Sequence, residues 1–481
     1  MQDCSDTVSA SKWHKNAGLL WLAREAPRAG LRLFMVGGSV RDYVLGRACA
    51  DIDLVSAQDP TEIAKNLART FKGHWFSLDA TRNYSRVILP APHAFQFDFS
   101  PFRAPNLSGD LALRDFTINA MAIDLAEIAD LAETASRADA AEIADTNVSH
   151  AAPSPSVLPI LDPLHGLKDL KRKRLHLCSA PVLQDDPLRI IKGLRHCATL
   201  GFSFSAATRS ASIAAVQGLS QIAPERLRSE MAGIFSATNF AHLRYALTEF
   251  HTCGAAAALD FPVSTSTTLT ARTFPELERA FTLLDLCSIK CSYIAARMQW
   301  SAGDEFTYRT FGLFAAWVRT STAADQHDPT AVPNLKLSRK AQAWLQWFLT
   351  CPEDILPQLD RMNSQRYPRR AMQYLAHAGA PLPHGLAALV FFSRNSADLH
   401  TLAELWHATG TCLDKGRLRP LLAATLIQQY YPKLEGKALG SCLESLNTAE
   451  RHGSISNSAE AWEWLKEYAR KQNFKPESEE R

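Results

Sequence analysis

The sequence feature that most restricts the fold is a strand, a glycine turn and a second strand near the start of the chain. Residues 31–36 are mostly apolar and predict a buried strand that ends at Gly37-Gly38. After a short helix, residues 51–55 alternate polar and apolar side chains, which places Asp51 and Asp53 on one face of a strand. This order of elements predicts an α/β domain.

The α/β pattern continues to about residue 125. The next expected elements are one helix and three strands, at residues 61–71, 75–78, 85–89 and 95–99. Alternation in the last strand places Asp98 opposite the phenylalanines, on a face away from the core. In the short helix before the aspartates, Ser39 is the expected N-cap, and Gly46 is expected to end the helix.

Composition limits location and partners. A length of 481 residues exceeds one ordinary core, so several domains are expected. The net charge of +3 neither proves nor excludes a nucleic-acid partner, and no apolar run reaches membrane-spanning length. The ten cysteines form no Cys-x-x-Cys pair, which indicates free thiols in a reducing compartment. We therefore expect a cytoplasmic protein without a membrane contact, and predict no protein partner.

Three carboxylates form the predicted catalytic centre. Asp51 and Asp53 point the same way from one strand, and Asp98 on a second strand could complete the set beside them. Two Mg²⁺ ions held in this way would activate a 3′-hydroxyl group, bridge a triphosphate and stabilise a leaving pyrophosphate. An Asp-x-Asp pair by itself is more often a solvated surface pair.

The glycine turn strengthens the catalytic interpretation. Gly37 and Gly38 lack Cβ atoms, so their backbone can approach a phosphate closely and direct N–H groups toward it. Arg41 follows in the first turn of the helix, where its guanidinium could reach the same phosphates. The plainer interpretation is a tight turn before a helix.

Five motifs in a fixed order resemble those of class II tRNA nucleotidyltransferases and bacterial poly(A) polymerases, members of the DNA polymerase beta nucleotidyltransferase superfamily. Together they cover about residues 30–235, which is more agreement than chance explains. The first is the glycine turn with its two aspartates (36–54), and the second is a ribose-selecting motif (114–122). They are followed by a head–neck hinge (162–170), a nucleotide-templating helix (185–202) and a last neck motif (225–230).

The resemblance implies a fold and a division of the chain. It implies an α/β nucleotidyltransferase (DNA polymerase beta-like) head domain followed by an all-α neck, body and tail. The expected units are the head, an acidic and alanine-rich insertion or linker, a templating and RNA-binding neck, and a tRNA-binding body and tail, at residues 1–125, 126–158, 159–235 and 236–481.

The resemblance also implies roles for single residues. Asp51, Asp53 and Asp98 would be the catalytic residues and the metal ligands. The nucleotide-binding residues would be Gly37, Gly38, Arg41, Arg114, Asp115, Asn119, Asp186, Arg189, Lys192 and Arg195. Arg114 and Asp115 would meet the sugar, where a carboxylate that accepts from the 2′-hydroxyl group favours ribonucleotides.

The templating helix would select the base. Asp186 and Arg189 would contact the base edge of an incoming C or A, because an aspartate accepts from the amino group that both bases carry. The four nucleotide-binding residues of this segment recur every three positions, close to one helix face. The plainer interpretation is a helix with Asp185 or Asp186 as N-cap and an ordinary cationic stripe.

The chain departs from the family pattern at a few positions. Asp185 stands where the family pattern has a glutamate, and Lys192 stands where it has an arginine. Leu113 also replaces an arginine, and His165 replaces a glycine. Only residues 104–113 separate Arg103 from Arg114, whereas family members that add the whole CCA sequence carry a longer, flexible loop there. The short connector favours an enzyme that adds only the two cytidines.

The implied activity is template-independent transfer of CMP and/or AMP from CTP or ATP to the 3′ end of tRNA, with pyrophosphate release and Mg²⁺ as cofactor. The implied partners are tRNA, CTP and ATP. A poly(A) polymerase is the alternative within the same chemistry. A catalytically dead RNA-binding protein on this fold is a third hypothesis, which the intact carboxylate set opposes.

The C-terminal half is less informative. Candidate phosphate contacts are Arg366, Arg369, Arg370, Lys415, Arg417 and Arg419, although solvated helix ends are the more common explanation. Trp344, Trp347 and Phe348 have helical spacing and are predicted to be core residues. His196 and His251 are assigned no role in a site.

Overall fold

The computed structural model describes residues 16–130, 158–261, 274–282, 308–321, 335–351 and 413–476, apart from the gaps at 48, 50, 92–94, 276, 415–416, 419, 452–453 and 456. The chain divides into two compact units, of which the first is Met1–Ile222 with Tyr245–Ala255 and the second is Ala223–Arg244 with Ala256–Arg481. No helix in the described ranges is long and apolar enough to cross a bilayer.

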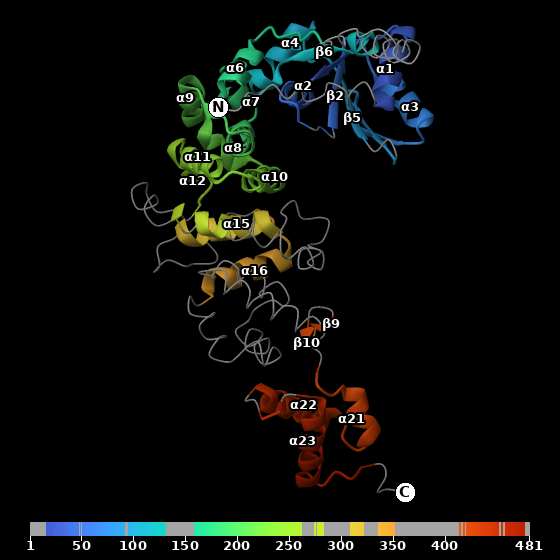
Figure 1. Ribbon diagram of the computed structural model, residues 1–481, viewed down its shortest axis with the longest axis vertical. Helices are drawn as coiled ribbons and strands as arrows, with labels where there is room; N and C mark the ends of the chain where they lie inside the picture. The colour runs from blue at the N-terminus through green and yellow to red at the C-terminus, as the bar shows by residue number, and fades with distance from the viewer. Residues whose placement is uncertain are drawn as a thin grey trace, which may run out of the picture. The chain divides into compact units, whose positions relative to one another are not determined.

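The first unit is built on a six-stranded mixed sheet with the order β3-β4-β5-β2-β1-β6 (Figure 1). The strands are β1 (Leu33–Val36), β2 (Asp51–Ser56), β3 (His74–Asp79), β4 (Tyr84–Leu89), β5 (Phe95–Pro101) and β6 (Ala122–Asp124). Strand β2 runs parallel to β5, and the other neighbours are antiparallel. The five strands expected from alternation are confirmed, and the short β6 is added to them.

Helices cover one face of this sheet. Helix α3 (Thr61–Thr70) packs against β3, β4 and β5, and α1 (Ala17–Arg28) packs against α3. The side chains beneath them, such as Val87, Phe97 and Phe99, are completely buried. Their neighbours along each strand therefore point to the opposite face. That opposite face carries the polar residues of the alternating pattern.

The rest of the first unit is mainly helical, as the sequence predicts. Its elements are α2 (Gly38–Val44), α4 (Leu107–Ala112), the 3₁₀ turn η2 (Thr117–Asn119), α6 (Gly166–Arg172), α7 (Val182–Asp185), α8 (Leu188–Leu200), α9 (Ala206–Ala215) and η3 (Val216–Gln221). A two-stranded parallel pair of β7 (Arg174–Leu175) and β8 (Ser203–Phe204) was not expected. It follows α6 and α8, and it ties the ends of these two helices together.

The second unit begins with α10 (Pro224–Phe235), which packs against α15 (Tyr308–Ser321), and α15 packs against α16 (Arg339–Thr350). The rings of Phe235 and Trp317 lie 5.8 Å apart. On α16 the rings of Trp344 and Phe348 stack at 5.1 Å, and both are buried. The prediction that these aromatic residues belong to a core is confirmed. Most of α11 (Phe240–Thr252) belongs to the first unit, and the other described elements before the tail are α12 (Ala255–Ala258), β9 (Leu413–Asp414) and β10 (Arg417–Leu418).

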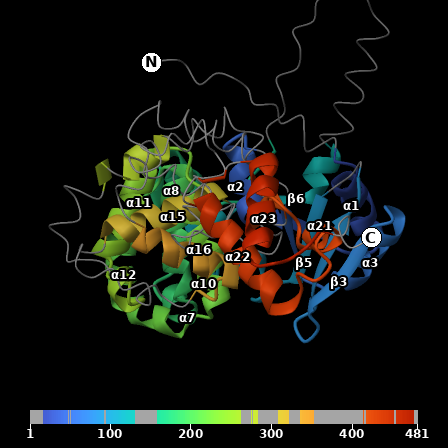
Figure 2. The ribbon, with the colours of Figure 1, turned by 90° about the horizontal axis from the view of Figure 1, so that it is seen from below.

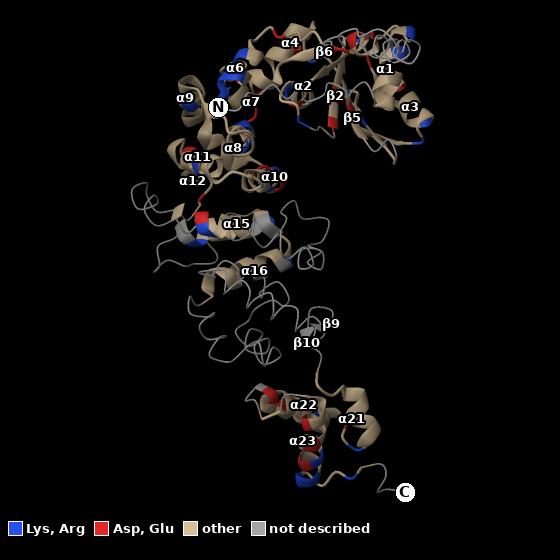
Figure 3. Cartoon of the chain, viewed as in Figure 1, with Lys and Arg blue, Asp and Glu red and all other residues tan. Residues whose placement is uncertain are grey.

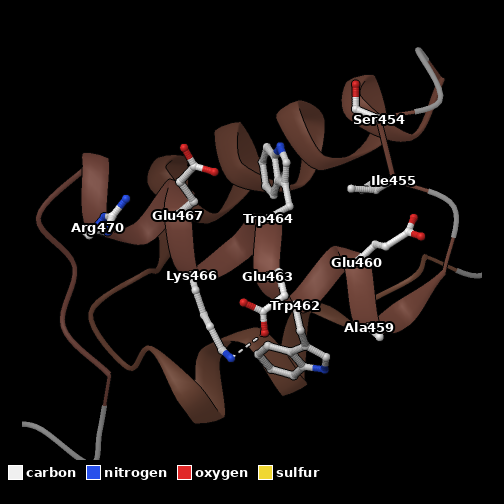
Figure 4. Close-up of a pocket in the computed structure, with 10 residues that line it drawn as sticks. All are labelled: Ser454, Ile455, Ala459, Glu460, Trp462, Glu463, Trp464, Lys466, Glu467 and Arg470. Carbon is white, nitrogen blue, oxygen red and sulfur yellow. Dashed lines mark hydrogen bonds and ion pairs between the residues drawn. The ribbon is translucent and has the colours of Figure 1, made fainter.

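The C-terminal helices form a core of their own. They are α21 (Ala424–Tyr430), α22 (Gly436–Arg451) and α23 (Ser458–Lys471), and α22 lies beside α23 in both ribbon views (Figures 1 and 2). Ile427, Cys442 and Leu465 are completely buried between them. A hollow on α23 is bordered by Trp462 and Trp464 (Figure 4), with an ion pair of 2.8 Å between Lys466 and Glu463 at its edge.

Candidate active site

The register of the sheet places the three predicted carboxylates on one face, opposite the face that α1 and α3 cover. In the parallel ladder of β2 and β5, Asp53 pairs with Asp98 and Asp51 pairs with Gln96. Paired residues in a ladder point to the same face, and so do residues two apart on one strand. Asp51 is exposed, while Asp53 and Asp98 are half-buried. The predicted convergence of strands on one acidic face is therefore present.

The surroundings of Asp53 shift the pKa of its carboxyl group. Its burial raises its pKa above the ordinary value, and the negative charges of Asp98 and Asp51 add to that rise, while Arg114 and Lys192 act in the opposite direction. A carboxylate that is disfavoured as an anion by two like charges gains from a cation placed beside it. The electrostatics of this face thus suit a positive ligand.

The carboxylate of Asp98 already has a positive partner. Arg86 on β4, its neighbour in the ladder, donates from Nε to Oδ1 and from Nη2 to Oδ2, both at 2.8 Å. Among the described residues, no three acidic, histidine or cysteine side chains are arranged closely enough to hold a metal ion as they stand.

The glycine turn lies directly against this cluster. Gly37 has φ +78°, and a Cβ atom there would lie 2.9 Å from Oδ2 of Asp53 and 3.0 Å from Nη1 of Arg114. Only glycine fits both the backbone conformation and the space. The N-cap of α2 is Gly37 and not Ser39, whose hydroxyl group instead donates to the Val36 carbonyl at 2.7 Å. The predicted cap was therefore wrong, whereas Gly46, at φ +64°, does follow the end of the helix.

Arg41 is buried, and its guanidinium is held in place by two partners. It donates to both carboxylate oxygens of Asp42 at 2.9 Å and from Nη1 to Oδ1 of Asn119 at 2.8 Å. Asn119 in turn donates from Nδ2 to Oδ1 of Asp115 at 3.0 Å. The predicted triphosphate residue and the predicted sugar residue are thus joined through one buried amide.

Asp115 is held ionised by the templating helix. Nζ of Lys192 on α8 lies 2.6 Å from its Oδ2. Burial alone raises the pKa of Asp115, but the charge of Lys192 and its hydrogen bond outweigh burial and hold the pKa well below its ordinary value. Asp115 therefore accepts hydrogen bonds at neutral pH, as the contact expected with a 2′-hydroxyl group requires.

His196 belongs to the same network, although the sequence analysis assigned it no role. Its Nε2 lies 3.4 Å from Nδ2 of Asn119. Burial, followed by the positive charges of Arg195, Arg41 and Lys192, lowers the pKa of His196 well below its ordinary value, so the ring is neutral. The signal was present in the sequence, because His196 lies four residues after Lys192 and hence on the same side of the helix.

Asp110 is a second residue that the sequence analysis missed. It is buried on α4, where Oδ1 accepts from the backbone N–H and from Nε of Arg103 at 3.1 and 2.9 Å, and Oδ2 accepts from Arg114 at 3.3 Å. Burial raises the pKa of Asp110, but these two arginines bring the net pKa below its ordinary value. The connector between Arg103 and Arg114 is thus a short helix pinned at both ends.

Helix α8 presents three of the four predicted residues on one side, whereas Asp186 precedes the helix and is the extended C-cap of α7. Arg189, Lys192 and Arg195 are half-buried, while most of the residues between them are buried. Arg189 donates to the carbonyl groups of Val182 at 3.1 Å and Leu113 at 3.4 Å. The N-cap of α8 is Pro187, without a side-chain hydrogen bond. The plainer interpretation, in which Asp185 or Asp186 caps the helix, was wrong.

The hinge motif explains one departure from the family pattern. His165, which replaces a glycine, has the left-handed conformation with φ +59° that glycine adopts most easily. The next residue, Gly166, has no alternative, because a Cβ atom there would lie 2.3 Å from the Thr117 carbonyl oxygen. Its N–H donates to Oδ1 of Asp162 at 2.6 Å.

The C-terminal candidates are not placed. Arg366, Arg369, Arg370, Lys415 and Arg419 lie outside the described residues, and Arg417 lies in β10 with its side chain outside the description.

An acidic strand pair on the open face of a mixed sheet, beside a glycine turn and a buried arginine, defines a nucleotidyltransferase head. Residues 33–176 match the poly A polymerase head domain family. This part of the chain is therefore a head domain of that family, in agreement with the motifs found in the sequence.

Individual relatives give the same picture. A CC-adding tRNA nucleotidyltransferase of Geobacter sulfurreducens is 28% identical over 477 residues, which cover 95% of this chain and 96% of that protein. An A-adding tRNA nucleotidyltransferase of Deinococcus radiodurans is 34% identical over 177 residues, 37% of this chain and 32% of that protein. The fold resembles the Thermotoga maritima CCA-adding enzyme complexed with tRNA, with a TM-score of 0.57, 19% identity and 93% of each chain covered.

Proposed function

We propose that this protein transfers CMP and/or AMP from CTP or ATP to the 3′ end of tRNA and releases pyrophosphate. The observation that carries the proposal is the register that sets Asp51, Asp53 and Asp98 on one open sheet face against the Gly37 turn. The similarity to a CC-adding tRNA nucleotidyltransferase over almost the whole of both chains supports tRNA as the substrate.

We further propose that Asp51, Asp53 and Asp98 hold Mg²⁺. Carboxylate oxygens are the ligands that Mg²⁺ prefers. Burial, with smaller contributions from the charges of Asp98 and Asp51, raises the pKa of Asp53, and a divalent cation beside it would favour the ionised form. The bound metal would act as a Lewis acid on the attacking 3′-hydroxyl group and the triphosphate. Asp53→Ala should abolish incorporation while the fold and RNA binding persist, and turnover near the wild-type rate would defeat the assignment.

The remaining site residues would bind and orient the nucleotide. Arg41, fixed by Asp42 and Asn119, would offer its guanidinium to the triphosphate, and Asp115 would accept from the 2′-hydroxyl group. Asp186 and Arg189 would contact the base. Arg189 at present donates to two backbone carbonyl groups, so its position is already fixed before a base arrives.

A CC-adding specificity is the version of the function that we favour. The connector before Arg114 is a six-residue helix, α4, that begins at an Asn106 cap and is pinned through Asp110. The most direct test offers tRNA ending at the discriminator base, at C and at CC, with CTP and ATP separately. Cytidine added to the first two and no adenosine added to the third would support it, whereas adenosine added to the CC end would refute it.

The same assay separates the alternatives. Long adenosine tracts on unrelated RNA would favour a poly(A) polymerase, the activity after which the matching head-domain family is named. Absence of metal-dependent incorporation into any RNA would favour a binding protein without catalysis. The expected division into head, insertion, neck, and body with tail stays a prediction, and so does a cytoplasmic location.

A basic segment next to the hinge is a further candidate for tRNA contact. Lys168, Lys171 and Arg172 on α6 and the following Lys173 are all exposed, and the helix carries visible positive charge in Figure 3. Lysine and arginine on one exposed helix end suit phosphate groups of any sequence. The sequence analysis did not single out this segment, because a short charge run is usually only a solvated surface.

A further inference from the structure

One row of side chains crosses the face of the sheet opposite α1 and α3. From β3 to β1 it contains Phe76, Arg86, Asp98, Asp53 and Val36, each the ladder partner of the next. Arg86 is thus one strand away from Asp98 and two strands away from Asp53. It is the cationic member of a row whose acidic members are the proposed metal ligands.

The contact between Arg86 and Asp98 is specific in its geometry. Two parallel N–H donors meet two carboxylate oxygens at 2.8 Å, the bidentate form that only arginine provides. With the Gln96 amide turned so that its oxygen accepts, that oxygen lies 3.2 Å from Nε and 3.1 Å from Nη2 of Arg86. The guanidinium is therefore oriented by two side chains of the neighbouring strand β5, Asp98 and Gln96.

Charge reinforces this geometry. The pKa of Arg86 is raised, mainly by the hydrogen bonds to Asp98 and further by the charges of Asp98, Asp51 and Asp53. All three aspartates therefore act on Arg86, although only Asp98 bonds to it. Arg86 is the counter-charge that the protein itself supplies to its acidic face.

A carboxylate with both oxygens committed to a guanidinium must share or give up those contacts before it can ligate a cation. We propose that Arg86 competes with the divalent cation for Asp98, so that the Arg86–Asp98 pair opens when the metal binds. The inference rests on the proposed function, because it takes Asp98 as a metal ligand. Arg86 is then a positioning residue that sets the free metal concentration at which the site fills.

Mn²⁺ binding to the full-length protein, followed by electron paramagnetic resonance without nucleotide or RNA, tests this competition. Arg86→Met should tighten the Kd for Mn²⁺ by about threefold to tenfold, the range expected for one charge-assisted pair at a half-exposed position. Arg86→Lys should tighten it less, because lysine keeps the charge and loses the bidentate contact. An unchanged or weaker Kd in Arg86→Met would overturn the proposal.

Arg82 provides the matched control. It lies in the turn between β3 and β4, is well exposed, and pairs with Asp79 at 3.7 Å. Arg82→Met removes the same charge close by in the sequence but away from the acidic row, and it should leave the Kd for Mn²⁺ unchanged. Thermal unfolding of each variant, with Arg86→Gln as a second substitution if Arg86→Met does not fold, separates the competition from a loss of structure.

A double-mutant cycle with Asp98→Asn decides whether Arg86 acts through Asp98. If it does, Arg86→Met should have little effect on the Kd once Asp98 is replaced. If Arg86→Met tightens the Kd equally with Asp98 and with Asp98→Asn, Arg86 acts only through the electrostatic field of its charge. That result would refute competition for Asp98. If the protein binds Mn²⁺ and the double-mutant cycle shows that Arg86 acts through Asp98, but no nucleotide is incorporated into any RNA, the proposed function is refuted. The competition between Arg86 and the metal would still be supported.

Discussion

At the scale of single residues, the site depends on one position that has no side chain. Gly37 combines a positive φ with two polar atoms about 3 Å from where a Cβ atom would be, and these atoms belong to Asp53 and Arg114. The backbone turn, the proposed metal ligand Asp53 and Arg114, which is expected to meet the sugar, therefore share one small space. A substitution here tests the assembly of the site more directly than removal of any charged group.

We expect Gly37→Ala to lower nucleotide incorporation by about a hundredfold or more, since a misplacement near 1 Å is enough for such a loss. Gly30→Ala is the control, because Gly30 has nearly the same φ of +73° and no atom within 4 Å of its Cβ position. It carries the backbone strain alone and should retain activity. Incorporation assays together with thermal melting make the comparison, and equal activity of the two variants would contradict the close packing at Gly37.

His196 predicts how stability depends on pH. Because its pKa in the folded protein lies below the ordinary value, the unfolded chain binds more protons in acid, and stability falls as the pH drops below about 6.5. Between neutral pH and a pH of about 5, the melting temperature of His196→Gln should therefore fall by less than that of the wild type. Parallel melting curves for the two proteins would contradict a buried neutral ring.

At the scale of elements, helices α4 and α8 supply charged side chains that orient residues of the site. Helix α4 contributes Asp110, whose carboxylate joins Arg103 at the start of the connector to Arg114 at its end. Helix α8 contributes Lys192, which fixes Asp115. Each element thus supplies one buried or half-buried charge that orients a residue expected to contact the nucleotide.

Asp110→Ala should reduce stability by about 2 kcal/mol, because it leaves two partly buried arginines without their shared acceptor. It should also raise KM for the nucleotide more than it lowers kcat, since Arg114 loses its orientation. Ser108→Ala, at an exposed position of the same helix, is the control. Denaturant unfolding and steady-state kinetics measure both effects, and an unaltered KM would separate Asp110 from the site.

The basic segment at α6 gives a prediction about RNA. Replacing Lys168, Lys171 and Arg172 by glutamine should weaken tRNA binding by about tenfold and make it less dependent on salt, as expected when phosphate contacts are lost. The affinity for a free nucleotide should not change. Filter binding at two salt concentrations makes the measurement, and an unchanged salt dependence would show that these side chains are only a solvated surface.

At the scale of the whole molecule, the acidic face lies in the first unit and the C-terminal helices form a separate core in the second. Stability and catalysis should therefore respond separately to changes in the tail. The buried Leu465 is a suitable place to examine this independence, since it lies at the centre of the core formed by α21, α22 and α23.

Leu465→Ala should destabilise the tail helices by about 2–5 kcal/mol, the usual cost of a cavity in a core. It should weaken tRNA binding, while the affinity of the first unit for a nucleotide stays unchanged. Lys466→Ala, on the same helix and exposed, should alter neither property by much. Calorimetry and nucleotide titration measure the two effects, and a parallel loss of nucleotide affinity would contradict the independence of the units.

The sequence alone determined the local pattern of this protein. Alternation placed Asp51, Asp53 and Asp98 on polar faces of their strands, and motif order indicated the family and most residues of the site, because periodicity and spacing are properties of the chain itself. Only the tertiary structure decided which charges meet. Arg86, Asp110 and His196 gained their places from strand register and helix packing, which join residues that are distant in the chain or carry no motif. The structure also places the N-cap of α2 at Gly37 instead of Ser39.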